Sequence, residues 1–197
     1  MPSRKPEDMA GRYETLRKIN QNTFSVYIAP GRDLQNALIS GPVRTVHGPI
    51  TFLFFGHAEP LLCLPPDQKY RIYFRRMEGM SGLIGAIRKD ESHLLFIQYS
   101  REHFEEYENS IPILAEECRT HARHTAPVVL LSVTYDHIIE QLGIQSDRYI
   151  IITEKNRKTI ARRNITAQKT LNDCPISPGS SHPQKEIHRY GQQPLSV

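Results

Sequence analysis

Two nearly continuous apolar runs constrain the fold of this 197-residue chain more than any other feature of its sequence. The first is His93–Tyr99 (His-Leu-Leu-Phe-Ile-Gln-Tyr) and the second is Pro127–Val133 (Pro-Val-Val-Leu-Leu-Ser-Val). Apolar runs without polar alternation are typical of strands that are buried on both faces of a sheet. The segment between them is long enough for a helix, and neighbouring parallel strands need such a crossover connection. The sequence therefore predicts an α/β fold of three layers, with a mostly parallel sheet between flanking helices.

The N-terminal half continues this alternation of strand and helix. Thr23–Ile28 is rich in aromatic and β-branched residues and predicts a strand. Asp33 is then expected to cap a short helix that extends through Ile39. Val43–His47 and Ile50–Phe55 lie on either side of a Gly-Pro turn, which predicts a hairpin or two successive strands.

Three further segments complete the predicted elements. After Asp67, apolar residues recur at steps of three and four from Tyr70 to Ile87 and predict an amphipathic helix. Three glycines weaken its second half, which is either helix or loop. Asp136 is expected to cap a short helix that closes at Gly143, and Tyr149–Ile152 is either a last strand or the start of a last helix.

Composition predicts one domain with two tails. A chain that is 39% hydrophobic can bury one ordinary core, which we place at residues 21–170. Residues 1–20 are expected to be flexible, and the Pro/Ser/Gly-rich residues 171–197 are expected to be disordered because they hold too little apolar surface to offset ordering entropy. No run of about 18 apolar residues occurs, so we expect a soluble protein that does not cross a membrane.

Cysteine usage and the polar N-terminus indicate the compartment. The three cysteines lie far apart and form a poor disulfide framework, which is typical of a reducing environment. The first residues lack the apolar stretch of a secretory signal. We therefore expect the protein in the nucleus or, alternatively, in the cytoplasm.

Sequence motifs give no anchor for catalysis or for a cofactor. No phosphate-binding loop occurs, and no Gly-x-Ser-x-Gly elbow singles out a nucleophile. The spacing Cys118-x-x-His121-x-x-His124 resembles a metal cluster, but on a helix the third residue would be about 240° from the first. We therefore interpret this segment as a buried thiol beside surface imidazoles and expect no metal.

Loop carboxylates are the other candidate for metal chemistry. Asp33, Glu59 and Asp67 follow predicted strands, where a metal-dependent nuclease could collect acids around magnesium. They are scattered along the chain, and acids in loops are usually solvated. We therefore expect a protein that is not an enzyme and has no cofactor and no small-molecule substrate.

Positive charge is concentrated near the end of the predicted domain, although the net charge is only +4. Several cations of this stretch recur at helical spacing and would form one basic stripe that contacts phosphates. A solvated helix, or one that pairs with the acidic helix around Glu105, is the alternative. The predicted nucleic-acid-binding residues are Lys155, Arg157, Lys158, Arg162, Arg163 and Lys169.

The order of these elements resembles a family of small meiotic crossover factors. The resemblance rests on His47–Gly56, the helix after Asp67, the two buried runs with their helices, and Asn164–Gln168, and it spans about residues 23 to 170. The family is that of sporulation protein sixteen, the non-catalytic partner of the XPF-like Zip subunit in the synapsis initiation complex.

This resemblance implies an XPF-nuclease-like fold without an active site. It also implies a heterodimer with a larger XPF-like subunit, binding to branched DNA during meiotic recombination, and a location on meiotic chromosomes in the nucleus. Active members carry Glu-Arg-Lys followed by Asp three residues later, and the nearest string here, Glu154-Lys-Asn-Arg157-Lys158, lacks the Asp.

The order of elements and the position of the partner face each allow an alternative. A degenerate Ras-like domain has a similar order of elements, with Asp136 near the guanine-reading position, and would act as a pseudo-GTPase scaffold without nucleotide hydrolysis. The partner face is expected on the apolar stripe of the acidic helix or on the helix Tyr70 to Ile87, although either stripe could be core. The stripe residues predicted to bind the partner are Phe104, Tyr107, Ile111 and Leu114.

Overall fold

The computed structural model describes residues 17–56, 60–61, 71–152 and 160–163, the last of these as backbone only. The chain divides into two compact units, residues 1–165 and 166–197, and every described residue belongs to the first unit. The predicted N-terminal segment lies outside the described residues except for 17–20, and so does the predicted tail at 171–197.

The first unit is built on one seven-stranded sheet with strand order β3-β2-β4-β5-β1-β6-β7. The six strands from β3 to β6 are parallel to one another, and β7 is antiparallel to β6 at one edge. The strands are β1 (Phe24–Ile28), β2 (Ile50–Phe55), β3 (Ile72–Met77), β4 (Leu94–Gln98), β5 (Val128–Ser132), β6 (Arg148–Ile151) and β7 (Ile160–Arg163).

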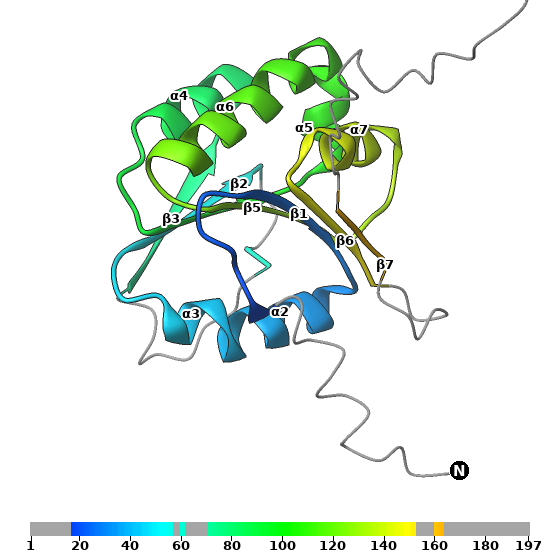
Figure 1. The fold of residues 1–197 in the computed structure, drawn as a ribbon. Coiled ribbons are helices and arrows are strands. Elements are labelled where there is room, and N and C mark those ends of the chain that lie inside the picture. The colour runs from blue at the N-terminus through cyan, green and yellow to red at the C-terminus, as the bar shows by residue number, and fades with distance from the viewer. Residues whose placement is uncertain (1–16, 57–59, 62–70, 153–159, 164–197) are drawn as a thin grey trace, which may run out of the picture. The chain divides into compact units, whose positions relative to one another are not determined.

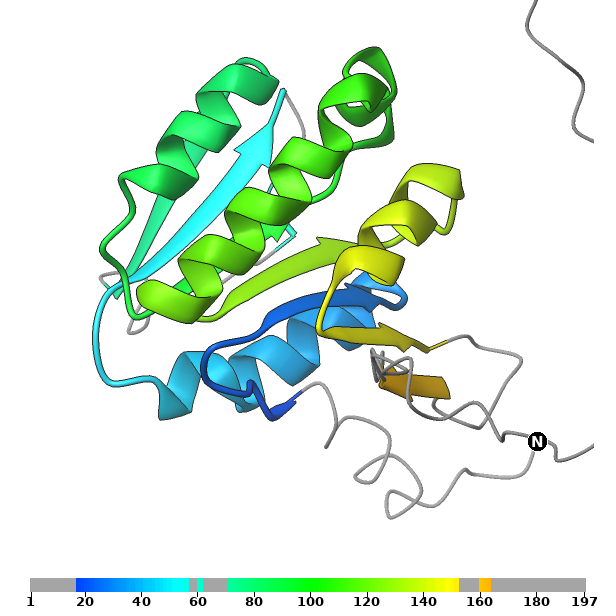
Figure 2. The same cartoon turned by 45° about the horizontal axis from the view of Figure 1, so that its top comes forward.

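Helices cover both faces of this sheet, as Figures 1 and 2 show. One face is covered by α2 (Gly31–Ser40) and α3 (Pro42–Thr45). The other face is covered by α4 (Met80–Arg88), α5 (Arg101–Glu106), α6 (Ile111–His124) and α7 (His137–Gln145), with a 3-10 turn at Glu108–Ser110. Within the described residues, none of these helices has the length and apolar character needed to cross a bilayer.

Each face of the sheet has its own hydrophobic core. Alternate side chains of a strand point to opposite faces, so Val26 packs under α4, α6 and α7 while its neighbour Tyr27 packs over α2. The central strands β1, β4 and β5 are buried along almost their whole length. The prediction of a parallel sheet between two layers of helices is confirmed, and so are the two buried runs that predicted β4 and β5.

Two predicted strands and one predicted cap have clear outcomes. Of the segment Tyr149–Ile152, left open between strand and helix, the first three residues belong to β6. The predicted strand Val43–His47 is wrong, because Pro42–Thr45 is a helical turn, so neither a hairpin nor two successive strands form; the predicted strand Ile50–Phe55 is confirmed. Asp33 lies inside the first turn of α2 and does not cap it, because the helix already begins at Gly31 behind Pro30.

The predicted helix Tyr70 to Ile87 is also wrong in its first half. Residues Ile72–Met77 form the edge strand β3, and the glycine-rich second half forms α4. A strand at an edge exposes side chains on both faces, which blurs the period of two that identifies a strand. Gly82 and Gly85 face open space, so the helix loses contacts there without meeting a steric conflict.

A buried contact between a histidine and a carboxylate joins α6 to the turn between α4 and β4. The Nε2 atom of His121 lies 3.5 Å from Oδ2 of Asp90, and both side chains are almost fully buried. Ser92 donates to the same carboxylate oxygen from its amide and from its hydroxyl. Burial alone would raise the pKa of Asp90, but hydrogen bonding by His121, Ser92 and Thr51 together holds this pKa below its ordinary value.

We expect Asp90→Asn to destabilise the fold by about 1 to 3 kcal/mol at pH 7, because buried donors would lose a charged acceptor. A carboxylate whose pKa is lowered by folding stabilises the native state above the pKa of the unfolded chain, and this contribution is lost as the pH falls through the folded pKa. Urea unfolding at pH 7 and at lower pH measures the free energy of unfolding of both proteins. The difference between the wild-type protein and the variant should shrink below about pH 4. Glu91→Gln, which changes an exposed neighbour, is the control, and a gap that stays constant with pH would contradict this account.

Candidate functional site

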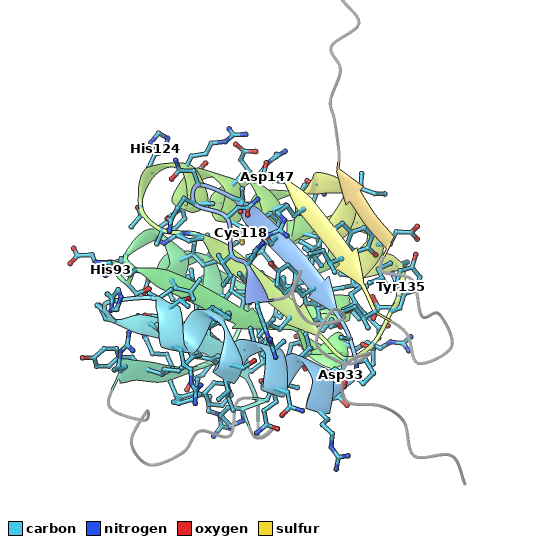
Figure 3. All side chains as sticks on the ribbon, turned by 60° about the horizontal axis from the view of Figure 1, so that its bottom comes forward. Asp33, His93, Cys118, His124, Tyr135 and Asp147 are labelled. Atoms are coloured by element: carbon cyan, nitrogen blue, oxygen red, sulfur yellow. The ribbon has the colours of Figure 1, made fainter. Side chains whose placement is uncertain are left out.

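Parallel α/β proteins usually bind ligands at the carboxyl ends of the strands, where neighbouring connections leave to opposite faces. Here β1 leads into α2 on one face of the sheet, and the adjacent β5 leads into α7 on the other face. Asp33 and Tyr135 lie at this end of the strands in Figure 3, whereas His93, His124 and Asp147 lie at the opposite end. This switch point is therefore the first place to look for a site.

The switch point is lined by groups that do not favour phosphate. Pro30 precedes α2 and has no N–H to donate, and Asp33 places an acid in the first turn of that helix. A Cβ atom built on Gly31 would lie 3.5 Å from Leu61 and 3.6 Å from Val133, so the loop packs against apolar side chains. Phosphate-binding loops instead present backbone amides and a cation to the ligand.

Asp136 is committed to two structural hydrogen bonds. Its Oδ1 atom accepts from the backbone N–H of Ile139, at 2.9 Å, which confirms the predicted cap of α7. Its Oδ2 atom accepts from the hydroxyl of Tyr99 at 2.8 Å, which joins the end of β4 to the start of α7. Burial raises the pKa of Tyr99, and the hydrogen bond to Asp136 adds to this rise. Both carboxylate oxygens of Asp136 therefore stabilise the fold. A Ras-like domain would instead use this residue to bind guanine.

The predicted partner stripe lies in the core. Phe104, Ile111 and Leu114 are fully buried under the helical layer, and Tyr107 is partly buried against the same cluster. Three of the four side chains therefore have no exposed surface for a partner, because the stripe faces the sheet. A single sequence cannot distinguish a stripe that binds a partner from a stripe that packs in the core, since both need an apolar helix face.

The candidate metal ligands are not brought together. Cys118 is fully buried, and burial raises the pKa of its thiol. His121 is buried beside Asp90 and is not the surface imidazole that we expected, whereas His124 is exposed. Within the part of the chain that the structure describes, no group of three potential ligands surrounds a common point. Glu59 and Asp67 lie outside that part.

Part of the basic stretch falls within the sheet. Lys155, Arg157, Lys158 and Lys169 lie outside the described residues. Arg162 and Arg163 belong to β7, so the predicted basic helix is wrong at these positions. A strand lacks the helical period of 3.6 residues, so these two positions do not contribute to a helical stripe.

The strand pairing adds cations from distant segments to these two arginines. Arg163 is the register partner of Arg148 in β6. The Nη1 atom of Arg148 donates to the carbonyl of Lys18 at 2.9 Å, which draws the N-terminal residues to the same edge. Lys18 and Arg17 are both exposed. We name this group the β7 edge and define it as Arg17, Lys18, Arg148, Arg162 and Arg163.

Arg148 is the residue that organises the β7 edge. Its guanidinium lies 6.0 Å from the centre of the Tyr27 ring and donates to the Tyr27 hydroxyl at 3.2 Å. Burial raises the pKa of Tyr27, and the charge of Arg148 acts in the opposite direction. The neighbouring acid, Asp147, accepts from the backbone N–H of Phe24 at 2.8 Å.

Sequence reasoning found Arg162 and Arg163 but missed Arg17, Lys18 and Arg148. Arg148 is a single cation beside an acid, and Arg17 and Lys18 are about 130 residues away from it, as the separation across the Arg148–Lys18 hydrogen bond shows. A pattern of charge along the chain carries no signal for a contact of this range. The only hint was the composition of residues 17–18, two adjacent cations before a predicted strand.

Compared with protein-family models and with curated proteins, the sequence matches neither a family nor an individual protein. The assignment of function therefore depends on the residues and geometry described above.

We expect Asp136→Ala to lower the free energy of unfolding by about 1 to 2 kcal/mol for the lost cap, with a further loss from the Tyr99 hydrogen bond. Tyr99→Phe removes only the second interaction and should cost about 1 kcal/mol. Chemical denaturation of both variants measures these two effects separately. If Asp136→Ala were no less stable than Tyr99→Phe, the cap would not be a determinant of α7.

Proposed function

We propose that this protein is a non-catalytic subunit of a heterodimer that binds branched DNA during meiotic crossover formation. The observation that supports this proposal is the β7 edge, where backbone pairing sets the strand of Arg162 and Arg163 beside Arg148, whose guanidinium donates to the carbonyl of Lys18. The resemblance to the crossover factors supplies the biological setting, the nucleus and the larger XPF-like partner.

The β7 edge fits a phosphate backbone better than a base edge. Each cation that approaches a phosphate releases condensed counterions, so five cations can supply several contacts that do not depend on base sequence. Contacts of this kind position a protein on DNA without reading its sequence. Preference for a branch would then come from the shape of the DNA and from the partner subunit.

Asp136, at the carboxyl ends of the strands, has a structural task, because it caps α7 and accepts from the hydroxyl of Tyr99. A pseudo-GTPase scaffold, the competing hypothesis, would use Asp136 for guanine, and its two oxygens are already engaged. Titration with a fluorescent guanine nucleotide separates the hypotheses, because micromolar binding would favour the scaffold.

Co-purification from native cells tests the heterodimer directly. The proposal expects one larger XPF-like chain to be recovered at a constant ratio. Recovery of this protein without such a chain would remove the heterodimer from the proposal and leave only the DNA-binding part.

We expect Arg162→Gln/Arg163→Gln to weaken binding to a branched DNA about equally for all sequences, and to reduce the slope of log K against log salt by about one unit for each lost phosphate contact. Fluorescence anisotropy over a range of salt concentrations measures both effects. Arg148 is left unchanged because it also holds Tyr27 and the N-terminal residues.

The matched control is Arg32→Gln/Lys89→Gln, which removes the same charge from two exposed residues outside the β7 edge. It should leave the salt slope close to that of the wild-type protein. Equal losses in the two double variants would mean that net charge, and not the β7 edge, determines the affinity.

A further inference from the structure

The opposite edge of the sheet, β3, has an unusual surface. Among the residues that the structure describes, β3 pairs only with β2, so its outer backbone groups face away from the sheet. Its four central side chains are all exposed, with 59% of Tyr73 and 37% of Phe74 accessible to solvent and Arg75 and Arg76 exposed beside them. Proteins commonly protect a free edge with short strands or charges, whereas this one presents two aromatic rings as well.

Phe74 is the last member of a row of rings that crosses the sheet. Phe96 in β4, Phe52 in β2 and Phe74 in β3 are register partners. The ring centres of Phe96 and Phe52 are 6.0 Å apart, and those of Phe52 and Phe74 are 5.4 Å apart, within the range of favourable aromatic pairs. The row is buried at Phe96 and Phe52 and becomes exposed at Phe74. A further aromatic ring beside Phe74 would continue it.

A second copy of the chain can supply that ring. Two copies of one strand that pair edge to edge in an antiparallel sheet are related by a twofold axis perpendicular to the sheet. In such a pair the side chains of directly opposite residues point to the same face of the sheet, and the twofold axis does not exchange the two faces. An even-numbered residue can therefore oppose only an even-numbered residue, and an odd-numbered residue only an odd-numbered one. The axis must then pass through one residue position of β3 and not between two positions.

Among the four exposed positions of β3, Phe74 is the one at which the axis avoids opposing like charges. An axis at residue 75 or 76 places Arg75 or Arg76 opposite its own copy, and an axis at Tyr73 places Arg71 opposite Arg75, arrangements that destabilise a strand pair.

An axis at Phe74 gives complementary pairs. It places the two Phe74 rings side by side and continues the aromatic row into the second copy. It also places each Tyr73 opposite an Arg75 on the other face of the sheet, where a guanidinium and an aromatic ring attract each other.

We propose that β3 pairs with β3 of a second copy in antiparallel orientation, with the twofold axis at Phe74. In this arrangement Phe74 lies beside its own copy and Tyr73 lies opposite Arg75, so the strand is complementary to itself. This self-complementarity identifies a second copy of the chain as the occupant of the edge. The inference does not depend on the proposed function, because the β7 edge lies at the other end of the sheet. A self-associated protein would present two β7 edges.

The first experiment is sedimentation of the full chain over a range of concentrations. The mass should rise from 22.7 kDa toward twice that value as the concentration increases, and Phe74→Glu should remain at the monomer mass. Arg123→Glu, an exposed residue of α6, is the control and should dimerise like the wild-type protein. Thermal unfolding of each variant confirms that it is folded.

The second experiment tests the position of the axis with disulfides. In a Cys63→Ser/Cys174→Ser background, with Cys118 buried, Phe74→Cys places two thiols at opposing positions about 4.5 to 5.5 Å apart between Cα atoms, which a disulfide can span. Mild oxidation should therefore give a covalent dimer. Arg76→Cys is the matched control on the same strand, because its two copies would be about 14 Å apart and should not crosslink.

Three outcomes would overturn the proposal. A monomer at every concentration, together with no crosslink at Phe74→Cys, excludes the second copy. A crosslink at Arg76→Cys in place of Phe74→Cys shows another register. A monomeric protein that loses its co-purifying partner on Phe74→Glu shows that a different protein occupies the β3 edge. Loss of DNA binding, in contrast, would bear only on the β7 edge.

Discussion

Burial of β1, β4 and β5 on both faces is the constraint on which the rest of this structure depends. In these strands the backbone N–H and C=O groups have no access to water, so each must be satisfied by a neighbouring strand. The register that results, with Val26 beside Leu130 and Phe96 beside Val129, fixes every other strand relative to the centre. Helices must then cover both faces, because apolar side chains point to each of them.

The packing of helices on both faces of the sheet limits the surfaces at which the protein can bind another molecule. The faces of the sheet are occupied by α2 and α3 on one side and by α4, α6 and α7 on the other. At the carboxyl ends of the strands, Asp136 and Tyr99 bond to each other and Val133 packs toward Gly31. Both edges of the sheet carry cationic residues, with Arg75 and Arg76 exposed on β3 and the residues of the β7 edge at the other end.

The two edges differ in their chemistry for a physical reason. At the β7 edge, cations come from segments far apart in the chain, and Arg148 orders them through a carbonyl and an aromatic ring. At β3, the arginines stand next to exposed rings of the same strand. Cations and rings in one short strand attract each other across a pair of copies, which favours association with a similar surface.

The sequence by itself determined the class of fold and its central strands, because a buried strand needs an uninterrupted apolar run such as Leu94–Gln98 or Val128–Ser132. It also determined the cap at Asp136, a local interaction over three residues. Only the tertiary structure decided that Ile72–Met77 is an edge strand, that Phe104 and Leu114 are core, and that Lys18 lies beside Arg148. Edge position, burial and contacts across about 130 residues depend on how the elements pack, and local patterns of polarity do not encode them.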